Sequence, residues 1–359
     1  MDPSAIPAFR LQSQHIKQAD FTSAEKVVSW MGAMQAQDYA GALWSIALRT
    51  PDLTKADVEQ AIIDRKIVRT WPMRGTLHFI AAKDARWMVQ LLAPRATAAA
   101  ASRRRALELT DAVLEKSKRL LETALTGEVA LSRQTLCDLL DTHGIATAGQ
   151  RGIHILRYFS EQGMLCFGPH EGKQPTFVLM DEWLSRTPEK SREEALFELT
   201  RRYFTSHGPA TLQDFAGWAN ITLTDARRGL MLVGDTLQQT ELNQKIYWHS
   251  PNFNVSQRPS LFLLPGFDEY ILGYKDRSAV LASEYVNRII PGGNGVFQAT
   301  IVSNGQVIGI WKRATKAKST RIHLEPFSAL SETEKKATVQ QAKRYEMFLQ
   351  SPVEITYAK

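Results

Sequence analysis

The sequence predicts an α+β protein in which three successive segments, each of helices followed by a β-hairpin, precede a β-rich C-terminal part. Three observations support this prediction. Apolar residues recur at helical spacing in several stretches, some of which begin with a Ser or Thr cap. Each group of helices is followed by β-forming residues around turn signals. After about residue 255, the chain alternates between polar and apolar residues or runs apolar in short stretches.

The first segment begins with Thr-Ser-Ala-Glu at residues 22–25, a capping-box pattern that predicts a helix through about Met34. Residues 41–50 predict a second helix, and Thr54 marks the start of a third. The stretch 67–81 is rich in β-forming residues and contains Pro and Gly turn signals, so we expect a hairpin there. Helices followed by a hairpin are typical of a winged helix, a variant of the helix-turn-helix motif.

The second and third segments repeat this order. Residues 127–145 predict a short helix, residues 146–169 a longer helix that leads into a strand, and residues 172–184 the returning strand. Residues 208–221 and 222–234 predict the two helices of the third copy, which two further strands follow. Residue identity between the copies is low, so we interpret them as a coarse structural repeat.

Residues 93–125 connect the first two copies, are strongly helical and carry three consecutive arginines at 103–105. In the C-terminal part, Asn304-Gly305 is a strong hairpin signal. Ser331 followed by Glu334 is a second capping box and predicts a closing helix over 331–350. The β-rich stretches are 260–274, 295–302, 306–314 and 320–327.

Composition favours a globular protein with an anionic partner. The 359 residues are 44% hydrophobic and 23% charged, which is ordinary for globular proteins and long enough for two or three domains. The net charge of +7 and the pI of about 9.3 favour nucleic acid as the partner. The two cysteines, Cys137 and Cys166, lie among apolar residues, so we expect buried thiols in a reducing cytosol.

Several classes of protein are not expected. The sequence has no residue spacing typical of a metal site, so we expect no metal and no cofactor. The N-terminal stretch lacks the apolar core of a signal peptide, and no run of 18 apolar residues occurs. We therefore expect a cytoplasmic protein that does not associate with a membrane.

The stretch Met-Gln-Ala-Gln-Asp-Tyr at residues 34–39 places two glutamines, Gln35 and Gln37, where a helical pattern breaks. Each amide offers one acceptor and two donors, and side chains two residues apart share one side of an extended backbone. The stretch is either a polar loop or a pair of amides that holds a water or a ligand.

Three winged helices and a positive charge together indicate a DNA-binding protein, with candidate recognition helices at 147–162 and 222–233. Arg74 and His78 lie on the first hairpin, and they either line the same cleft as the two glutamines or belong to a wing that faces water. Each basic residue either contacts phosphate or forms part of a solvated face. The expected DNA-contacting residues are Arg74, His78, Arg103, Arg104, Arg151, Arg227, Arg228, Lys312 and Arg313.

Two carboxylates, Asp268 and Glu269, stand beside aromatic residues in an otherwise apolar stretch. Acidic side chains in a basic DNA-binding surface need a reason. We expect them to form structural ion pairs with Arg277 or Lys275.

Four stretches carry a resemblance to a known family: QAQDYAGALWSIALR, RGTLHFIAAKDARW, LLPGFDEYILGYKDR and GVFQATIVSNGQVIGIWKR. Together they span residues 35–313 and resemble the winged-helix DNA glycosylase family of the azinomycin-B resistance type, typified by AlkZ, and its AlkX-like relatives. The resemblance implies three tandem winged-helix motifs arranged around a C-terminal β-barrel-like scaffold. It also implies that Gln35 and Gln37 are the catalytic Gln-x-Gln pair, with a small residue, Ala36, in the middle position.

With this fold, the chain is expected to divide into five parts. They are a first winged helix with the Gln-x-Gln motif (1–92), a helical connector (93–125), a second winged helix (126–190), a third winged helix (191–255) and a β-rich scaffold with a closing helix (256–359).

The resemblance implies a monofunctional DNA glycosylase that excises cationic N7-alkylated purines, and several members of the family unhook interstrand crosslinks. An alkylated purine already carries positive charge, so its glycosidic bond breaks without a general acid. Two fixed amides then need only position a water beneath the sugar. The motif contains no lysine, so we expect no Schiff base and no strand cleavage. The expected partner is double-stranded DNA containing alkylated purines, bound by a monomer without an obligate protein partner.

Two other hypotheses remain open. The chain is alternatively a non-catalytic winged-helix DNA-binding protein, such as a transcriptional regulator. Regulators of this kind are usually small dimers that read two half-sites, and three winged helices in one long chain fit that poorly. A protein that sequesters small molecules in the same concave surface is the third hypothesis. Tight binding of a drug without DNA would support it.

Overall fold

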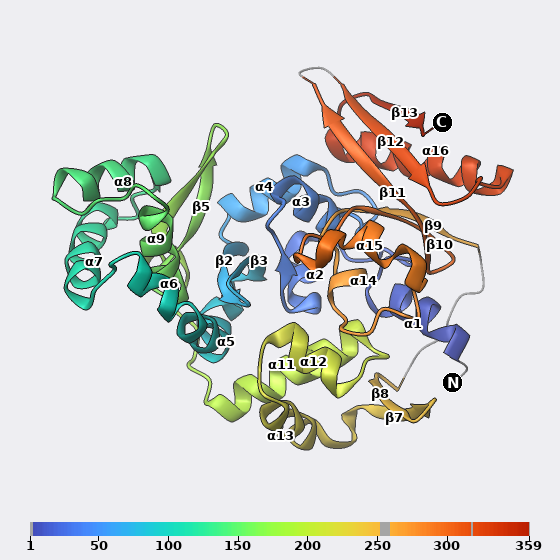
Figure 1. Cartoon of the computed structure of the whole chain (residues 1–359), viewed down its shortest axis with the longest axis horizontal. Coiled ribbons are helices and arrows are strands. Elements are labelled where there is room, and N and C mark those ends of the chain that lie inside the picture. Colours follow the sequence, from blue (N-terminus) through green and yellow to red (C-terminus); the bar gives the residue numbers. More distant parts are fainter. Residues whose placement is uncertain (1–2, 252–258, 317–318, 359) are drawn as a thin grey trace. The chain divides into compact units, whose positions relative to one another are not determined.

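The computed structural model describes residues 3–251, 259–316 and 319–358 (Figure 1). The chain folds into two compact units. The first unit comprises the described residues of Met1–Val58, Phe197–Trp218 and Thr222–Lys359. The second comprises Glu59–Leu196 and Ala219–Ile221.

The first unit begins with α1 (Ile6–Ser13), α2 (Ala24–Met31), the two-residue strand β1 (Met34–Gln35) and α3 (Tyr39–Ala47). The cap of α2 is Ser23, whose hydroxyl accepts from the backbone N of Lys26 at 3.3 Å. The capping box expected over 22–25 is therefore wrong by one residue. The helix also ends at Met31, earlier than expected, because Gly32 follows with φ of 78°.

Helix α4 (Lys55–Ile63) leads to the second unit, which opens with the hairpin of β2 (Ile67–Met73) and β3 (Thr76–Ala81). Its two turn residues, Arg74 and Gly75, both have positive φ, at 55° and 67°. Two positive φ values in a two-residue loop are typical of a type I′ turn, which matches the twist of paired strands. The hairpin predicted over 67–81 is confirmed.

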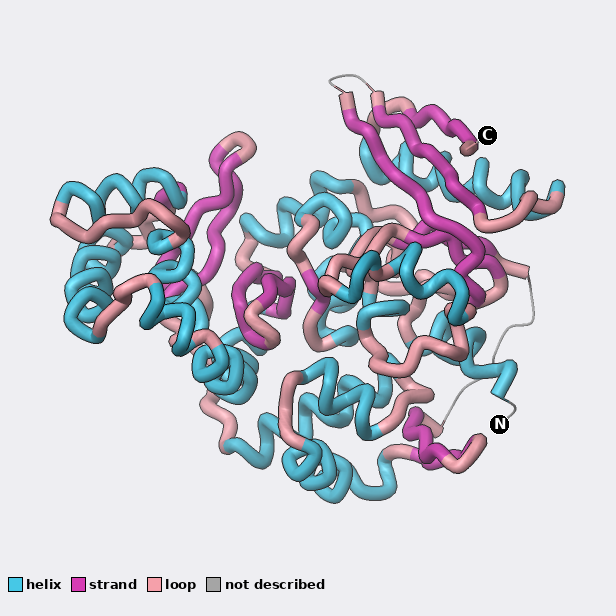
Figure 2. Tube along the Cα trace, viewed as in Figure 1, coloured by secondary structure: helices cyan, strands magenta, loops and turns pink. Residues whose placement is uncertain are grey.

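The rest of the second unit alternates helices with strands of one sheet. Within the unit the strand order is β3-β2-β5-β6-β4, and all neighbours are antiparallel. Figure 2 shows α7, α8 and α9 lying beside the β5–β6 hairpin. The elements are α5 (Ala85–Ala99), α6 (Ala101–Ala106), α7 (Asp111–Leu125), β4 (Leu131–Ser132), α8 (Arg133–Thr142), α9 (Arg151–Glu161), β5 (Leu165–Glu171), β6 (Gln174–Leu179) and α10 (Met180–Trp183).

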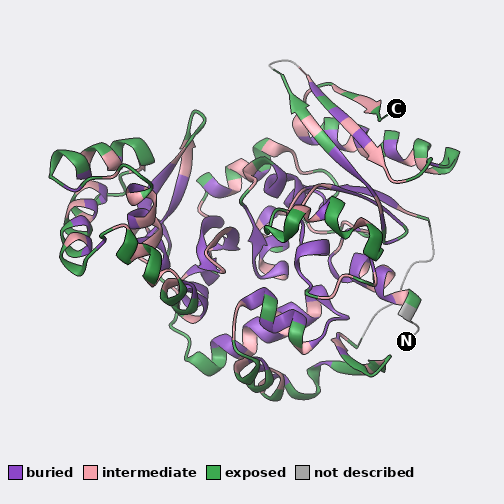
Figure 3. Cartoon of the chain, viewed as in Figure 1, coloured by how far each residue is buried: buried purple, intermediate pink, exposed green. Residues whose placement is uncertain are grey.

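Three aromatic rings form the centre of the core of the second unit. Trp71 and Phe167 have ring centroids 5.1 Å apart, and Phe167 and Phe177 have theirs 4.4 Å apart. Figure 3 shows that the β5–β6 hairpin is buried towards its base and exposed at its tip. The leucines that close this core from α7, α8 and α9 are Leu121, Leu125, Leu136, Leu140 and Leu156.

From Phe197 onwards the third segment belongs to the first unit, apart from Ala219–Ile221. A bridge between Ala210 and Trp248 connects the start of the segment to its last strand. The order helix, short strand or bridge, two helices, hairpin thus occurs three times along the chain, beginning at α2, α7 and α11. The elements of this segment are α11 (Arg192–His207), α12 (Leu212–Ala219), α13 (Leu223–Val233), β7 (Gln238–Leu242) and β8 (Lys245–His249).

The C-terminal part forms a five-stranded sheet in the order β13-β12-β11-β10-β9. Strands β9 and β13 are its two edges, so within the described residues the sheet is open and the expected barrel-like closure is wrong. The elements are β9 (Leu261–Leu264), α14 (Glu269–Leu272), α15 (Val286–Ile289), β10 (Thr300–Ser303), β11 (Gln306–Thr315), β12 (Thr320–Pro326), α16 (Glu332–Leu349) and β13 (Val353–Tyr357). Short 3-10 helices cover Pro3–Ala5, Ala82–Asp84, Gly234–Thr236, Ser283–Tyr285 and Pro291–Gly293.

In the C-terminal part, two of the local sequence signals are confirmed, and one predicted strand is shorter than expected. The capping box of Ser331 and Glu334 is confirmed, as is the hairpin turn at Asn304-Gly305. The β-rich stretch 260–274 forms a strand only as far as Leu264. A helical turn, α14, follows because Asp268 caps it.

Helix α16 packs on the sheet through aromatic contacts. The Trp44 ring of α3 lies 5.0 Å from Tyr345 and 5.1 Å from Phe348, both on α16. Its Nε1 also donates to the carbonyl of Leu263 on β9 at 2.9 Å. One indole thus joins the helix that follows the Gln-Ala-Gln stretch to the C-terminal sheet.

The two cysteines differ in burial. Both cysteines are free thiols; Cys166 is buried, and burial raises its pKa, whereas Cys137 is only half-buried. Among the described residues, no helix is long and apolar enough to cross a membrane, and no group of metal-ligating side chains gathers. The five-part division remains a prediction. Its last boundary, at 255/256, lies outside the described residues.

The aromatic core of the second unit gives a stability prediction. Phe177→Ala removes a ring that is 1% exposed, so we expect the free energy of unfolding to fall by about 3–5 kcal/mol in urea denaturation. Val129→Ala trims an exposed apolar side chain of the same unit and should change it by less than about 0.5 kcal/mol. Equal effects of the two substitutions would contradict this assignment of the core.

Candidate active site and nucleic-acid interface

The Gln-Ala-Gln stretch lies in the first unit between α2 and α3. Gln35 ends strand β1 and is 7% exposed, Ala36 is fully buried, and Gln37 is exposed. The two glutamines are therefore not equivalent. One lies within the protein, and the other lies at the surface.

The downstream end of the stretch is fixed by Asp38. Its carboxylate caps α3 by accepting from the backbone N of Gly41 at 3.2 Å. It also accepts two hydrogen bonds, at 2.5 and 2.6 Å, from Nη2 of Arg313 on β11. The structure thus places Arg313, an expected DNA contact, against the residue that follows Gln37.

The upstream end is fixed by Glu269, a carboxylate that is 1% exposed. Its Oε1 accepts from the backbone N of Gln35 at 3.2 Å. Its Oε2 accepts from Nε1 of Trp218 at 2.9 Å and lies 3.4 Å from Nε2 of His207. One carboxylate thus holds the main chain of the candidate catalytic residue and two aromatic side chains.

His207 is fully buried and lies between Glu269 and Ser206. Burial lowers the pKa of His207, although the neighbouring Glu269 acts in the opposite direction. Its Nδ1 lies 2.7 Å from the hydroxyl of Ser206. We therefore expect a neutral imidazole at neutral pH, and the carboxylate beneath Gln35 is held by hydrogen bonds.

The turn that carries Glu269 is held by a buried ion pair. Nη1 and Nη2 of Arg49 donate to the two carboxylate oxygens of Asp268 at 3.0 and 3.1 Å. The hydroxyl of Ser45 donates to the same carboxylate at 2.6 Å. Burial raises the pKa of Asp268, but Arg49 and the hydrogen bonds together lower it below its usual value. Since Asp268 caps α14, the pair fixes the start of that helical turn.

The expected partners of the two carboxylates were wrong. Asp268 pairs with Arg49 instead of Arg277 or Lys275. Nε of Arg277 donates to the carbonyl of Ile271 at 2.8 Å, and the backbone N of Lys275 donates to the carboxylate of Asp214 at 2.8 Å.

Sequence reasoning did not assign functional roles to Glu269, His207 and Trp218. The signal available was the position of two carboxylates within the apolar run LLPGFDEYILGY. Charged residues are seldom fully buried unless they are paired, so their presence in such a run indicates buried polar contacts. The identity of the partners was not available, because Trp218 lies 51 residues from Glu269 in the chain.

In the second unit, Arg74 and His78 contact each other. Nη2 of Arg74 lies 2.9 Å from Nε2 of His78, whose Nδ1 lies 3.0 Å from the carbonyl of Thr76. His78 is fully buried; burial first, and then Arg74, lower its pKa well below the usual value. The neutral ring therefore carries its proton on Nδ1 and accepts from Arg74. This hydrogen bond from Arg74 to His78 fixes the orientation of the guanidinium group.

A basic surface lies beside this turn. Arg157 of α9 approaches Gly75 so closely that a Cβ there would lie 2.3 Å from its Nη2. Burial lowers the pKa of the neighbouring His154, and the charges of Arg157 and Arg103 lower it further. Arg103 is exposed and donates to Oε1 of Gln150 at 2.9 Å. Arg157 itself pairs with Glu161 at 2.7 Å, so Arg103 is the exposed cation near this histidine.

Two other expected DNA contacts bind backbone carbonyls. Nη1 of Arg104 donates to the carbonyl of Thr97 at 2.7 Å. Nε of Arg151 donates to Ala146 at 2.7 Å, and its Nη1 donates to Leu107. Both guanidinium groups thus hold backbone carbonyls of their own unit.

The remaining expected contacts belong to the first unit. Arg227 and Arg228 are exposed on α13. Lys312 is exposed on β11 and pairs with Glu325 of β12 at 2.6 Å. Arg74 and His78 belong to a different compact unit from Gln35 and Gln37, and a cleft shared by these four residues stays a prediction.

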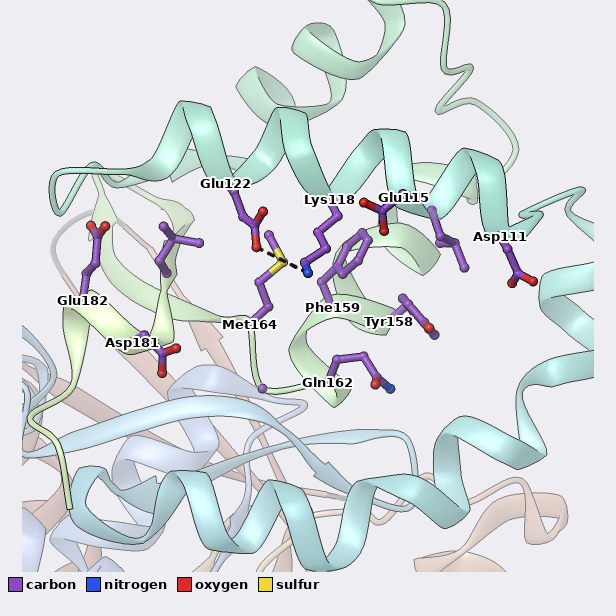
Figure 4. Close-up of a pocket in the computed structure, with 13 residues that line it drawn as sticks. Asp111, Glu115, Lys118, Glu122, Tyr158, Phe159, Gln162, Met164, Asp181 and Glu182 are labelled. Atoms are coloured by element: carbon purple, nitrogen blue, oxygen red, sulfur yellow. Dashed lines mark ion pairs between the residues drawn. The ribbon is translucent and has the colours of Figure 1, made fainter. Parts of the chain in front are cut away.

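The second unit also has a pocket of about 580 Å³, which none of the expected site residues lines (Figure 4). Glu115, Lys118 and Glu122 extend from α7, and Tyr158 and Phe159 belong to α9. Carboxylates outnumber the single lysine in its lining, and phosphates are repelled by such a surface. The pocket therefore does not fit a DNA backbone.

Comparison with known proteins identifies the class of protein. Residues 28–348 match the family described as DNA glycosylase AlkZ-like. The match covers most of the chain, and the protein therefore belongs to the AlkZ-like family of DNA glycosylases.

Two further comparisons match proteins of Streptomyces sahachiroi. The chain is 25% identical over 323 residues to an interstrand DNA cross-link repair glycosylase, covering 85% of this chain and 86% of the relative. It also matches the solved structure of the S. sahachiroi DNA glycosylase AlkZ with a TM-score of 0.81 and 24% identity, over 98% of this chain and 99% of the other. The mixed α+β fold is thus similar to that of AlkZ.

The buried carboxylate gives a prediction about local stability. Glu269→Gln keeps the size of the side chain but replaces one acceptor oxygen with a donor, which leaves a buried donor unsatisfied. We expect the free energy of unfolding to fall by about 1–3 kcal/mol and the amide of Gln35 to exchange faster with solvent deuterium. Glu325→Gln removes a partly exposed ion pair and should cost less than about 1 kcal/mol. Unchanged exchange at Gln35 would contradict this role.

The buried His78 gives a pH prediction. Its folded pKa lies well below the usual 6.5, so below that pH the unfolded chain binds a proton that the folded chain does not. This difference makes the protein less stable as the pH falls below about 6.5. Ring nitrogen NMR, assigned with a His78→Gln variant, should show a neutral Nδ1-protonated tautomer still present at about pH 5.5. A titration midpoint near 6.5 would show that the ring is accessible.

Proposed function

We propose that this chain is a monofunctional DNA glycosylase that hydrolyses the N-glycosidic bond of cationic N7-alkylated purines, with Gln35 and Gln37 positioning the water. The observation that carries the proposal is the fixed Gln-Ala-Gln stretch. Glu269 holds the backbone of Gln35 from one side, and the pair of Asp38 and Arg313 holds the other side. Membership of the AlkZ-like family supports it.

The proposed chemistry needs position more than basicity. An N7-alkylpurine leaves as a neutral base, because the alkyl group already supplies the positive charge that a general acid would otherwise provide. The sugar passes through an oxocarbenium-like state, and a water must lie beneath it at that moment. Amide oxygens can orient such a water without deprotonating it, provided that they are held rigidly. The two fixed ends of the stretch supply that rigidity.

The proposed reaction ends at the abasic site. Strand cleavage by a bifunctional glycosylase uses an amine that attacks the sugar and forms a Schiff base. The Gln-Ala-Gln motif itself contains no lysine. The expected product therefore needs alkali before the strand breaks.

We further propose that the three repeated segments are winged helices that bind duplex DNA. Arg74 on the first hairpin and the exposed Arg103 lie near α9, the last helix before the hairpin of the second segment, and support this proposal. Arg227 and Arg228 on α13 occupy the corresponding helix of the third segment. Phosphate contacts of this kind would position the duplex without reading its sequence.

The relative named as an interstrand cross-link repair glycosylase extends the proposal to a second substrate class. A crosslink joins two bases, and each alkylated purine within it carries the same activating charge. The water-positioning mechanism therefore applies to either end of a crosslink. We propose that the chain unhooks crosslinks in addition to excising monoadducts.

Base release tests the catalytic assignment. Duplex DNA with a single N7-methylguanine is incubated with the protein, and abasic sites are then cleaved with alkali. We expect Gln35→Ala and Gln37→Ala each to lower the rate at least about tenfold with DNA affinity unchanged. Gln60→Ala, an exposed glutamine on α4, is the matched control and should retain the wild-type rate.

Two outcomes would overturn this proposal. If the wild type binds DNA well but releases no base from methylated or crosslinked duplexes, the non-catalytic DNA-binding hypothesis is favoured. If strands break without alkali, the reaction is not monofunctional. Because Gln37 is exposed, its alanine variant should fold normally, so loss of activity there cannot be assigned to unfolding.

A further inference from the structure

The first unit contains a groove of about 810 Å³ whose lining does not include the Gln-Ala-Gln stretch. Its walls come from α12, α13, β8 and the chain just after α14. Pockets of 300–1,000 Å³ generally hold small molecules or single residues of a polymer. Its lining includes the apolar side chains of Leu230, Ile246 and Trp248 and the basic side chains of Arg227, Lys245 and Lys275.

Two large apolar side chains of the groove, Ile246 and Trp248, are exposed to solvent in part. Ile246 is 49% exposed, and Trp248 is partly exposed two residues further along β8. The backbone of Trp248 is fixed to Ala210 by hydrogen bonds of 2.8 and 3.1 Å. Alternation along a strand puts Ile246 and Trp248 on one face. A rigid indole is thus available to a ligand.

Three basic and two acidic side chains line the groove. Arg227 and Lys275 are exposed, whereas Lys245 pairs with Asp276 at 2.6 Å. The second carboxylate, Asp214, is buried and accepts from the backbone N of Lys275 at 2.8 Å. Both carboxylates therefore already have partners within the protein, and Arg227 and Lys275 remain exposed in the lining.

We propose that this groove binds one unstacked nucleotide of a DNA strand, with its base stacked on Trp248 and its phosphate near Arg227 and Lys275. The inference rests on the DNA-binding part of the proposed function. Proteins that hold single strands combine cationic grooves with aromatic rings, because every base has a π-face. A paired base inside a duplex cannot reach an indole in this way.

A protein partner fits the groove less well. Stable protein interfaces involve about 20–30 residues on each side. The groove is lined by twelve residues, which matches a single nucleotide much better.

The groove is connected to the support of Gln35 through α12. Asp214, near the start of α12, holds the backbone of Lys275 in the groove wall. Trp218, one turn further along the same helix, donates to Glu269, which holds the backbone of Gln35. A nucleotide in the groove would therefore contact the same rigid set of elements that carries the candidate catalytic stretch.

Binding of two matched DNA probes tests the proposal. One is a short blunt duplex, and the other is the same duplex with a single-stranded thymidine extension, both followed by fluorescence anisotropy at low salt. We expect wild type to prefer the extended duplex. Trp248→Leu should weaken binding of that probe about five- to tenfold while leaving the blunt duplex unchanged. Trp248→Phe, which keeps an aromatic face, should retain most of the preference.

Controls separate stacking from other effects. Met347→Ala changes a side chain on α16 that is 62% exposed and does not line the groove, so both affinities should stay as in wild type. Circular dichroism of Trp248→Leu and Trp248→Phe checks that the hairpin still folds. The same variants are assayed for base release from a blunt methylated duplex, which should be unaffected.

Three results would overturn the proposal. Equal binding of both probes by wild type, with base release intact, would reject the groove as a nucleotide site and leave the proposed function standing. Equal behaviour of Trp248→Leu and Trp248→Phe would reject stacking. An acidic amphipathic peptide that binds the groove while the extended probe does not would make it a protein-docking surface. Failure of wild type to release base, with the probe preference present, would reject the proposed catalysis alone.

Discussion

The hydrogen bond between the backbone of Gln35 and the buried carboxylate of Glu269 is the contact around which the first unit is arranged. Trp218 holds the other oxygen of that carboxylate, and the ion pair of Arg49 and Asp268 fixes the turn on which it stands. Removing one partner from a buried ionic pair usually costs about 3–5 kcal/mol, because the remaining charge is stranded. Contacts among Gln35, Arg49, Trp218 and the turn of Asp268 and Glu269 therefore fix the position of the Gln-Ala-Gln stretch.

In the proposed reaction, rigid support would matter because an amide is a weak catalytic group. It neither accepts a proton at neutral pH nor attacks a sugar, so its contribution must come from where it is held. The two glutamines differ in this respect. Gln35 is buried and backed by Glu269, whereas Gln37 is exposed and is followed by Asp38, which Arg313 fixes. We interpret Gln37 as the residue that meets the substrate from the surface, with Gln35 behind it.

The arginines of this basic chain serve two purposes. Arg49, Arg104 and Arg151 bind carboxylates or carbonyls within their own units, while Arg103 and Arg227 are exposed. A guanidinium has five donors and can hold several loop carbonyls at once, which a lysine cannot do with the same geometry. Net charge therefore overstates the number of groups available to phosphate. Burial and hydrogen-bond partners separate the two groups of arginines.

Local features of the sequence were sufficient for much of the fold. The order of helices and hairpins, the capping box at Ser331 and the turn at Asn304-Gly305 depend on neighbouring residues, and the pattern of 34–39 singled out the two glutamines. The tertiary structure alone decided that the C-terminal sheet stays open, that Asp268 pairs with Arg49 and that Glu269 supports Gln35. Each of these depends on partners far away in the chain, and Arg49 lies 219 residues from Asp268. Periodicity and capping describe nearest neighbours, whereas the pairing of buried charges is settled only when the folded chain brings them together.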